Sequence, residues 1–104
     1  MQSRDYLERM IRRIAEAVAK AAGLRSEGRL EEAEHAVDEA WSHAFSLRRK
    51  DTDRFTAEAL VDLLGPKAAA AATLLEELGR IEEARGDTVR AAKLNERART
   101  LRGG

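Results

Sequence analysis

The chain has 104 residues, which is the length of one domain. Its 19 basic and 19 acidic side chains cancel, which argues against a strongly basic nucleic-acid binder or a polybasic membrane binder. Without any Cys, the sequence excludes disulfides, zinc–thiolate sites, Cys nucleophiles and iron–sulfur clusters.

The composition favours helices over strands. Twenty residues are Ala, β-branched residues are few, and no segment alternates apolar and polar side chains as a half-buried strand does. We therefore predict an all-α fold with a single domain over residues 1–104, an antiparallel bundle of four to five helices.

The first two predicted helices form a hairpin over residues 4–47. The first runs from about 4 to 24, with Ser3 as its N-cap. Its apolar stripe is Leu7, Ile11, Ile14, Val18 and Ala21. The second runs from about 29 to 47, with acidic residues at its start and Arg48, Arg49 and Lys50 at its end, which suits the helix dipole.

A short third helix is predicted as an insertion over residues 56–64. Thr56 is its N-cap, Gly65 ends it, and Pro66 begins the next helix at a position that tolerates proline.

A second hairpin follows over residues 67–102. Its first helix ends near Arg85, and its second helix has Asp87 as N-cap and an apolar stripe of Ala91, Leu94, Ala98 and Leu101.

The two hairpins share a pattern of small residues at an offset of 58 positions. When Gly28 is set against Gly86, Ala33 falls on Ala91 and Ala40 on Ala98. This pattern resembles the tetratricopeptide repeat, and the second hairpin carries it best, with Leu75, Leu78, Gly79, Gly86, Asp87, Ala91 and Ala98. The departures are Ala17, Lys20 and Asn95, which stand where the repeat has larger apolar residues. The repeat is 34 residues long, so the offset leaves 24 extra residues around the inserted helix.

The resemblance implies a module that binds a protein or peptide. Such repeats bind on the concave face of the first helix of each hairpin, here the first and fourth predicted helices. The chain also resembles a family of short, uncharacterised bacterial all-helical proteins, whose members open with a segment like Asp5-Tyr6-Leu7. That second resemblance implies no activity.

Three of the four aromatic residues are candidate partner-binding residues: Trp41, Phe45 and Tyr6. Trp41 and Phe45 are four residues apart and share one helix face, which is the arrangement of an anchoring patch. The alternative interpretation is that both pack the second helix against the inserted third helix.

Both His residues lie on the second predicted helix. Glu31, His35, Glu39 and His43 follow at four-residue steps, and Glu32 with His35 forms a Glu-x-x-His pair. Ferritin-like dimetal proteins use two such pairs and two further carboxylates. A second pair would require a homodimer, so we interpret this row as a solvated helix face and keep a metal-binding bundle as the remote alternative.

No set of residues with the spacing of a catalytic site is found, so we predict no enzyme activity, no cofactor and no metal. Acidic residues at the start of the second helix argue against DNA binding. The basic last helix has either a solvated face or a docking surface for an acidic partner.

The predicted function is a protein–protein interaction or adaptor module. The alternative is a homo-oligomeric structural protein that buries an apolar patch near Ala68–Ala72 at a two-fold axis. The charged N-terminus and the absence of a membrane-length apolar run predict a cytoplasmic location.

Overall fold

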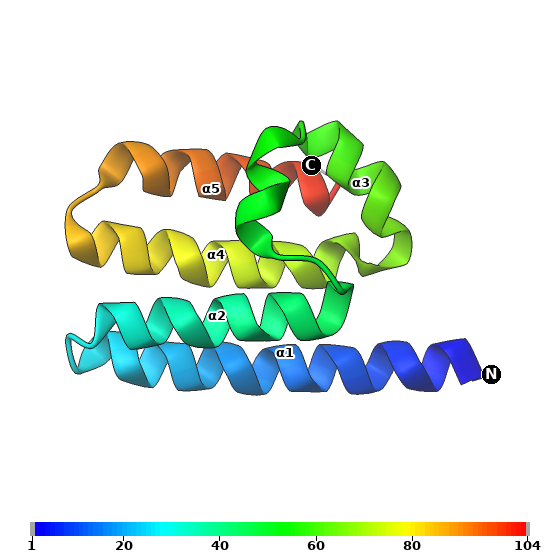
Figure 1. The fold of residues 1–104 in the computed structure, drawn as a ribbon, viewed down its shortest axis with the longest axis horizontal. Coiled ribbons are helices and arrows are strands. Elements are labelled where there is room, and N and C mark those ends of the chain that lie inside the picture. Colours follow the sequence, from blue (N-terminus) through cyan, green and yellow to red (C-terminus); the bar gives the residue numbers. More distant parts are fainter. Residues whose placement is uncertain (1, 104) are drawn as a thin grey trace.

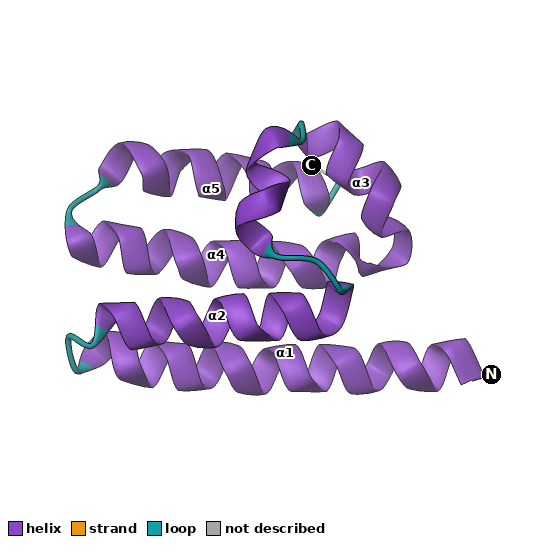
Figure 2. Cartoon of the chain, in the orientation of Figure 1, coloured by secondary structure: helices purple, strands orange, loops and turns teal. Residues whose placement is uncertain are grey.

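The fold is all-helical, as predicted. A computed structural model describes residues 2–103, and there are no strands among them. Five α-helices and two short 3-10 helices are joined by brief turns (Figures 1 and 2). In chain order they are α1 (Gln2–Ser26), α2 (Leu30–Phe45), η1 (Arg49–Arg54), α3 (Ala57–Leu64), η2 (Gly65–Lys67), α4 (Ala68–Arg85) and α5 (Thr88–Leu101).

The helices form two antiparallel hairpins that meet at α4. α1 packs on α2, α4 packs on α5, and α4 also contacts both α1 and α2. The short α3 packs mainly on α5, close to the C-terminal end of the chain (Figure 1). Among the described residues, this arrangement leaves α1 and α2 with a surface that no other helix covers.

Two of the three predicted N-caps are confirmed. The Thr56 side chain accepts the backbone N–H of Ala59, and the Asp87 side chain accepts that of Arg90, both at 3.0 Å. Each bond satisfies an N–H that the first helical turn leaves unpaired. The prediction for Ser3 is wrong, because α1 already begins at Gln2.

The apolar stripe of α1 differs from the predicted one. Ile11 is 50% exposed, whereas its neighbour Met10 is buried together with Ile14 and Ala21. Successive residues on a helix point about 100° apart, so the buried stripe is turned toward α2, the main partner of α1. Leu7 and Val18 are partly buried and pack against the edge of the core.

The core lies where α2 and α3 meet α4. Trp41, Leu60, Leu74, Leu75, Leu78 and Ile81 are its largest fully buried apolar side chains. Ala68, Ala71 and Ala72 are buried in the same core, and only Ala69 of this run is exposed. The apolar patch expected around Ala68–Ala72 is therefore part of the core and is not available as a free surface.

Small residues bring α4 and α5 close together, as the repeat pattern predicts. Gly79 is buried, and a Cβ added there would lie 2.6 Å from Asn95 Oδ1. Ala91 and Ala98 are buried on the α5 side, and all four predicted stripe residues of α5 are buried. Small side chains at a crossing allow helix axes to approach at the short end of the usual packing distances.

Ala98→Leu should destabilise the protein by about 1–3 kcal/mol, because three extra carbon atoms would be forced into a filled crossing. The free energy of unfolding in urea measures this change. Ala92→Leu is the matched control, since Ala92 is an exposed residue of the same helix. Equal stabilities for the two variants would contradict the close α4–α5 packing.

Candidate partner-binding site

The three aromatic candidates do not lie together. Trp41 and Phe45 are buried in the core, with ring centroids 4.8 Å apart in an edge-to-face arrangement. They therefore cannot anchor a partner on this surface, and their role is corrected to core packing. The helix-face pattern is the same for an exposed patch and a buried one, which is why the sequence left both interpretations open.

Tyr6 is the aromatic candidate that remains at the surface. Its side chain is 47% exposed, and Lys67 Nζ lies 5.2 Å from the centroid of its ring. Such a contact is a cation–π interaction of modest strength at an exposed position. Tyr6 also lines one end of a groove between α1 and α2.

This groove, which we call the α1–α2 groove, has a volume of about 700 Å³ and is lined by side chains of α1 and α2 alone. Its floor is apolar and consists mostly of small residues: Met10, Ile14, Ala17, Ala36, Ala40 and Ala44. On each helix these positions are three or four residues apart, so they share one helix face between positions 10 and 17 of α1 and between positions 36 and 44 of α2. The groove exists because alanines leave unfilled space between the two helices.

The rim of the groove is mainly basic. Arg9, Arg13 and Lys20 border it on α1, and Glu39 and His43 border it on α2. Arg13 Nη1 lies 3.0 Å from His43 Nε2 across the hairpin, which is a hydrogen bond if the Nε2 of the imidazole is unprotonated. A groove with an apolar floor and a charged rim binds an amphipathic segment better than a purely apolar or purely polar one.

This groove was not predicted from the sequence. The repeat resemblance implies a concave face on the first and fourth helices, yet α4 packs directly against α1, and an ion pair of Arg25 with the buried Glu77 joins them at 2.8 Å. The available signal was the four-residue spacing of Ala36, Ala40 and Ala44 on the second helix. Of these, only Ala40 entered the repeat pattern, where it was interpreted as a small residue at a helix crossing.

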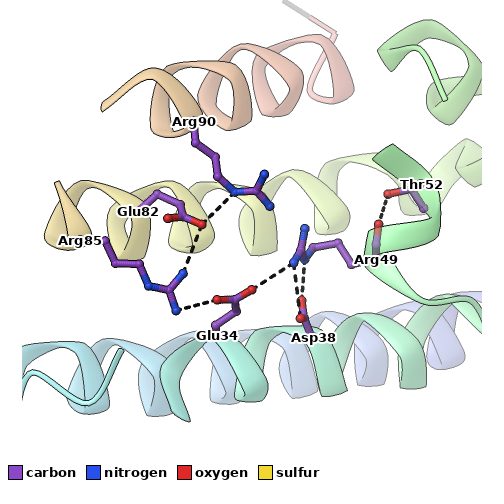
Figure 3. A network of polar contacts seen from close by, with 7 residues as sticks. All are labelled: Glu34, Asp38, Arg49, Thr52, Glu82, Arg85 and Arg90. Carbon is purple, nitrogen blue, oxygen red and sulfur yellow. Dashed lines mark hydrogen bonds and ion pairs between the residues drawn. The ribbon is translucent and has the colours of Figure 1, made fainter. Parts of the chain in front are cut away.

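A network of charged side chains links α2, η1, α4 and α5 behind the groove (Figure 3). Glu34 is central to it: it accepts from Arg85 at 2.7 Å and from Arg49 at 3.4 Å. Arg85 also contacts Glu82 of its own helix, and Glu82 accepts from Arg90 of α5 at 2.8 Å. Its three arginines match its three carboxylates, so the network is neutral and offers no charge for a ligand.

Arg49 is the buried arginine of this network. Its side chain is almost fully enclosed and donates through Nε and Nη2 to Asp38, while Thr52 Oγ1 donates to the Arg49 carbonyl (Figure 3). The prediction that the second helix runs to about Leu47, with Arg48, Arg49 and Lys50 at its end, is wrong in its boundary. α2 ends at Phe45, where Ser46 adopts the left-handed conformation (φ 59°) and turns the chain back over α2.

Of the five basic side chains in α5 and its C-cap, three form contacts within the described residues. Arg90 pairs with Glu82, Arg97 donates to the carbonyl of Phe55 at 2.7 Å, and Arg102 donates to Glu76 at 2.8 Å. The Arg102 guanidinium lowers the pKa of Glu76, chiefly through this hydrogen bond. These contacts favour an internal role for the basic residues of α5 over a dock for an acidic partner.

The two His residues do not converge on a metal site. His35 is exposed and lies 3.6 Å from Glu39, while His43 faces Arg13 at the groove. Within the described part of the chain, no three His, Cys, Asp or Glu side chains are placed to hold a metal ion.

Among the described residues, no helix is both long enough and apolar enough to cross a membrane.

Comparisons with known proteins do not extend this picture. The sequence matches no protein-family model, and neither the curated proteins nor the solved structures contain one that is significantly similar to it.

Proposed function

We propose that this chain is a non-catalytic protein-interaction module that binds a helical segment of a protein in the α1–α2 groove. The observation that carries the proposal is the groove itself, in which an apolar floor of small side chains is bordered by Arg9, Arg13 and Lys20. Grooves of this kind receive amphipathic helices, whose apolar side chains enter the floor while flanking charges meet the rim.

The arrangement of the hairpins supports the same proposal. α4 packs against both helices of the first hairpin, which is how successive tetratricopeptide-like hairpins stack. We accordingly propose that the two hairpins are repeat-like, with the groove on the outer side of the first. A cytoplasmic location stays a prediction of the sequence.

The experiment uses a photo-reactive phenylalanine analogue placed at Arg9 or Lys20, which border the groove, and at Val89 as the control. Val89 is 68% exposed and lies on α5, away from the groove. We expect crosslinks to protein from the two groove positions and none from Val89 after irradiation of cells that contain the chain.

A second variant tests whether the floor is required. Ala40→Arg adds a long side chain at a half-buried position of the groove, and it should abolish crosslinking from Lys20 while the helical content is retained. Crosslinking that is equal from Val89, or unchanged in Ala40→Arg, would show that this groove is not the binding surface.

A further inference from the structure

We propose that the occupant of the α1–α2 groove is helix α3 of a second copy of this chain, an inference that rests on the proposed function and names its partner. Two surface features of the described residues support this dimer, the groove and the outer face of α3. Both features are apolar at their centre, their charged side chains have opposite signs, and their residues have the same spacing.

The outer face of α3 carries an apolar row. Leu63 is 54% exposed, and Ala59, one turn earlier, and Pro66 after the helix are exposed on the same side. Leu63 is one of four large apolar side chains that the described residues expose. Contact of an exposed leucine side chain with water is unfavourable, and this free-energy cost is removed when a partner covers the side chain.

An acidic row lies beside this apolar row. Glu58 and Asp62 are both exposed and are one turn apart, and α3 contains no basic residue. α1, by contrast, contains six basic and three acidic residues, and its Arg9 and Arg13 are also one turn apart on the rim of the groove. The charges of α3 are therefore opposite to those of the groove rim.

The two surfaces have the same spacing. On α3 the acids Glu58 and Asp62 directly precede Ala59 and Leu63 in the sequence. On α1 the arginines Arg9 and Arg13 directly precede the floor residues Met10 and Ile14. Each helix thus has a charged row next to an apolar row with a four-residue period, so both rows can be matched at once.

The shape of the groove excludes a simpler dimer in which two grooves face each other. Both surfaces would then be hollow, and the unfilled space would lack the contacts that packed interfaces require. Such a dimer would also not use Leu63. A convex helix end that presents Leu63 between Ala59 and Pro66 fills the hollow, and the alanines at positions 36, 40 and 44 leave room for it.

Each copy offers both an α3 and a groove, so two copies can exchange the same contact. α3 and the N-terminal half of α1 lie at the same end of the molecule, on the right in Figure 1. A two-fold axis would repeat the contact, with each α3 in the groove of the other copy, and would leave neither surface uncovered.

The first test is sedimentation velocity of the full chain over a concentration series up to the millimolar range. We expect a dimer, and Leu63→Glu should raise its dissociation constant by about tenfold or more. Val89→Glu is the matched control, because it places the same charge at an exposed apolar residue of α5. Its dissociation constant should equal that of the unmodified chain.

A charge exchange provides the decisive test. The double variants Arg9→Glu with Arg13→Glu, and Glu58→Arg with Asp62→Arg, should each be monomeric, because like charges then face one another in the contact. A mixture of the two variants should associate again, since each groove meets an α3 of opposite charge.

The outcomes separate this inference from the proposed function. A chain that stays monomeric at all concentrations, or a dimer that neither charge variant weakens, would overturn the placement of α3 in the groove. If photo-crosslinks from Lys20 then join the chain to a different protein, the groove is a binding site and only its assigned occupant is wrong. Absence of any groove crosslink would instead reject the proposed function.

Discussion

Trp41→Ala should cost about 3–5 kcal/mol of stability, the largest effect that we expect from a single substitution. Trp41 of α2 is fully buried and packs edge-to-face on Phe45. Its removal would leave a cavity that the surrounding leucines fill only in part, so the lost transfer free energy and the cavity term add. Urea or thermal unfolding followed by far-UV circular dichroism measures the change.

Two further variants locate the origin of that loss. Val89→Ala removes a large apolar side chain from the surface and should change stability by less than about 0.5 kcal/mol. Trp41→Phe should fall between the two, because it keeps a ring and deletes a buried Nε1–H that has no partner among the described residues. If Trp41→Ala were as stable as the Val89 variant, Trp41 could not be a core residue.

Arg49→Met should destabilise the protein by about 2–3 kcal/mol. The substitution keeps most of the side-chain length but leaves Asp38 without its buried partner, while Glu34 keeps its ion pair with Arg85. Both carboxylates are partly exposed and can be rehydrated, so the expected loss is smaller than for a fully enclosed pair. The same change should free the segment from Ser46 to Phe55, and limited proteolysis should cleave it faster.

The neighbouring arginine is a natural control for this prediction. The Arg48 side chain is 81% exposed and pairs only with Asp51 in the described structure. Arg48→Met should therefore change stability by less than about 0.5 kcal/mol and leave proteolysis unaltered. If the two variants had the same stability and the same rate of proteolysis, Arg49 would not be the residue that holds the segment from Ser46 to Phe55 against α2.

The fold could be predicted from the sequence further than the site. Helix positions depend on local signals, such as the Thr56 and Asp87 caps and the glycines at 65 and 86, and local signals are read directly from the chain. The side of α1 that is buried depends on where α2 and α4 pack. That packing is a property of the tertiary structure, and it buries Met10 while Ile11 stays exposed.

The burial of Arg49 shows a second limit. In the sequence it stands between two other basic residues after an acidic helix, which is the pattern of a solvated helix end. Only the reversal of the chain at Ser46 brings it over Asp38, and a non-glycine residue with a positive φ gives little sequence signal. The groove was missed for a related reason, because alanines indicate close packing and unfilled space equally well.

The central place of α4 has a consequence for cooperativity. α4 contacts α1, α2, α3 and α5, whereas the two hairpins have few contacts that bypass it. Neither hairpin can open without uncovering the apolar side chains of α4, so an intermediate with one hairpin intact would expose part of the core that both hairpins share. The chain should therefore unfold as one unit, unlike long repeat arrays in which terminal hairpins fray independently.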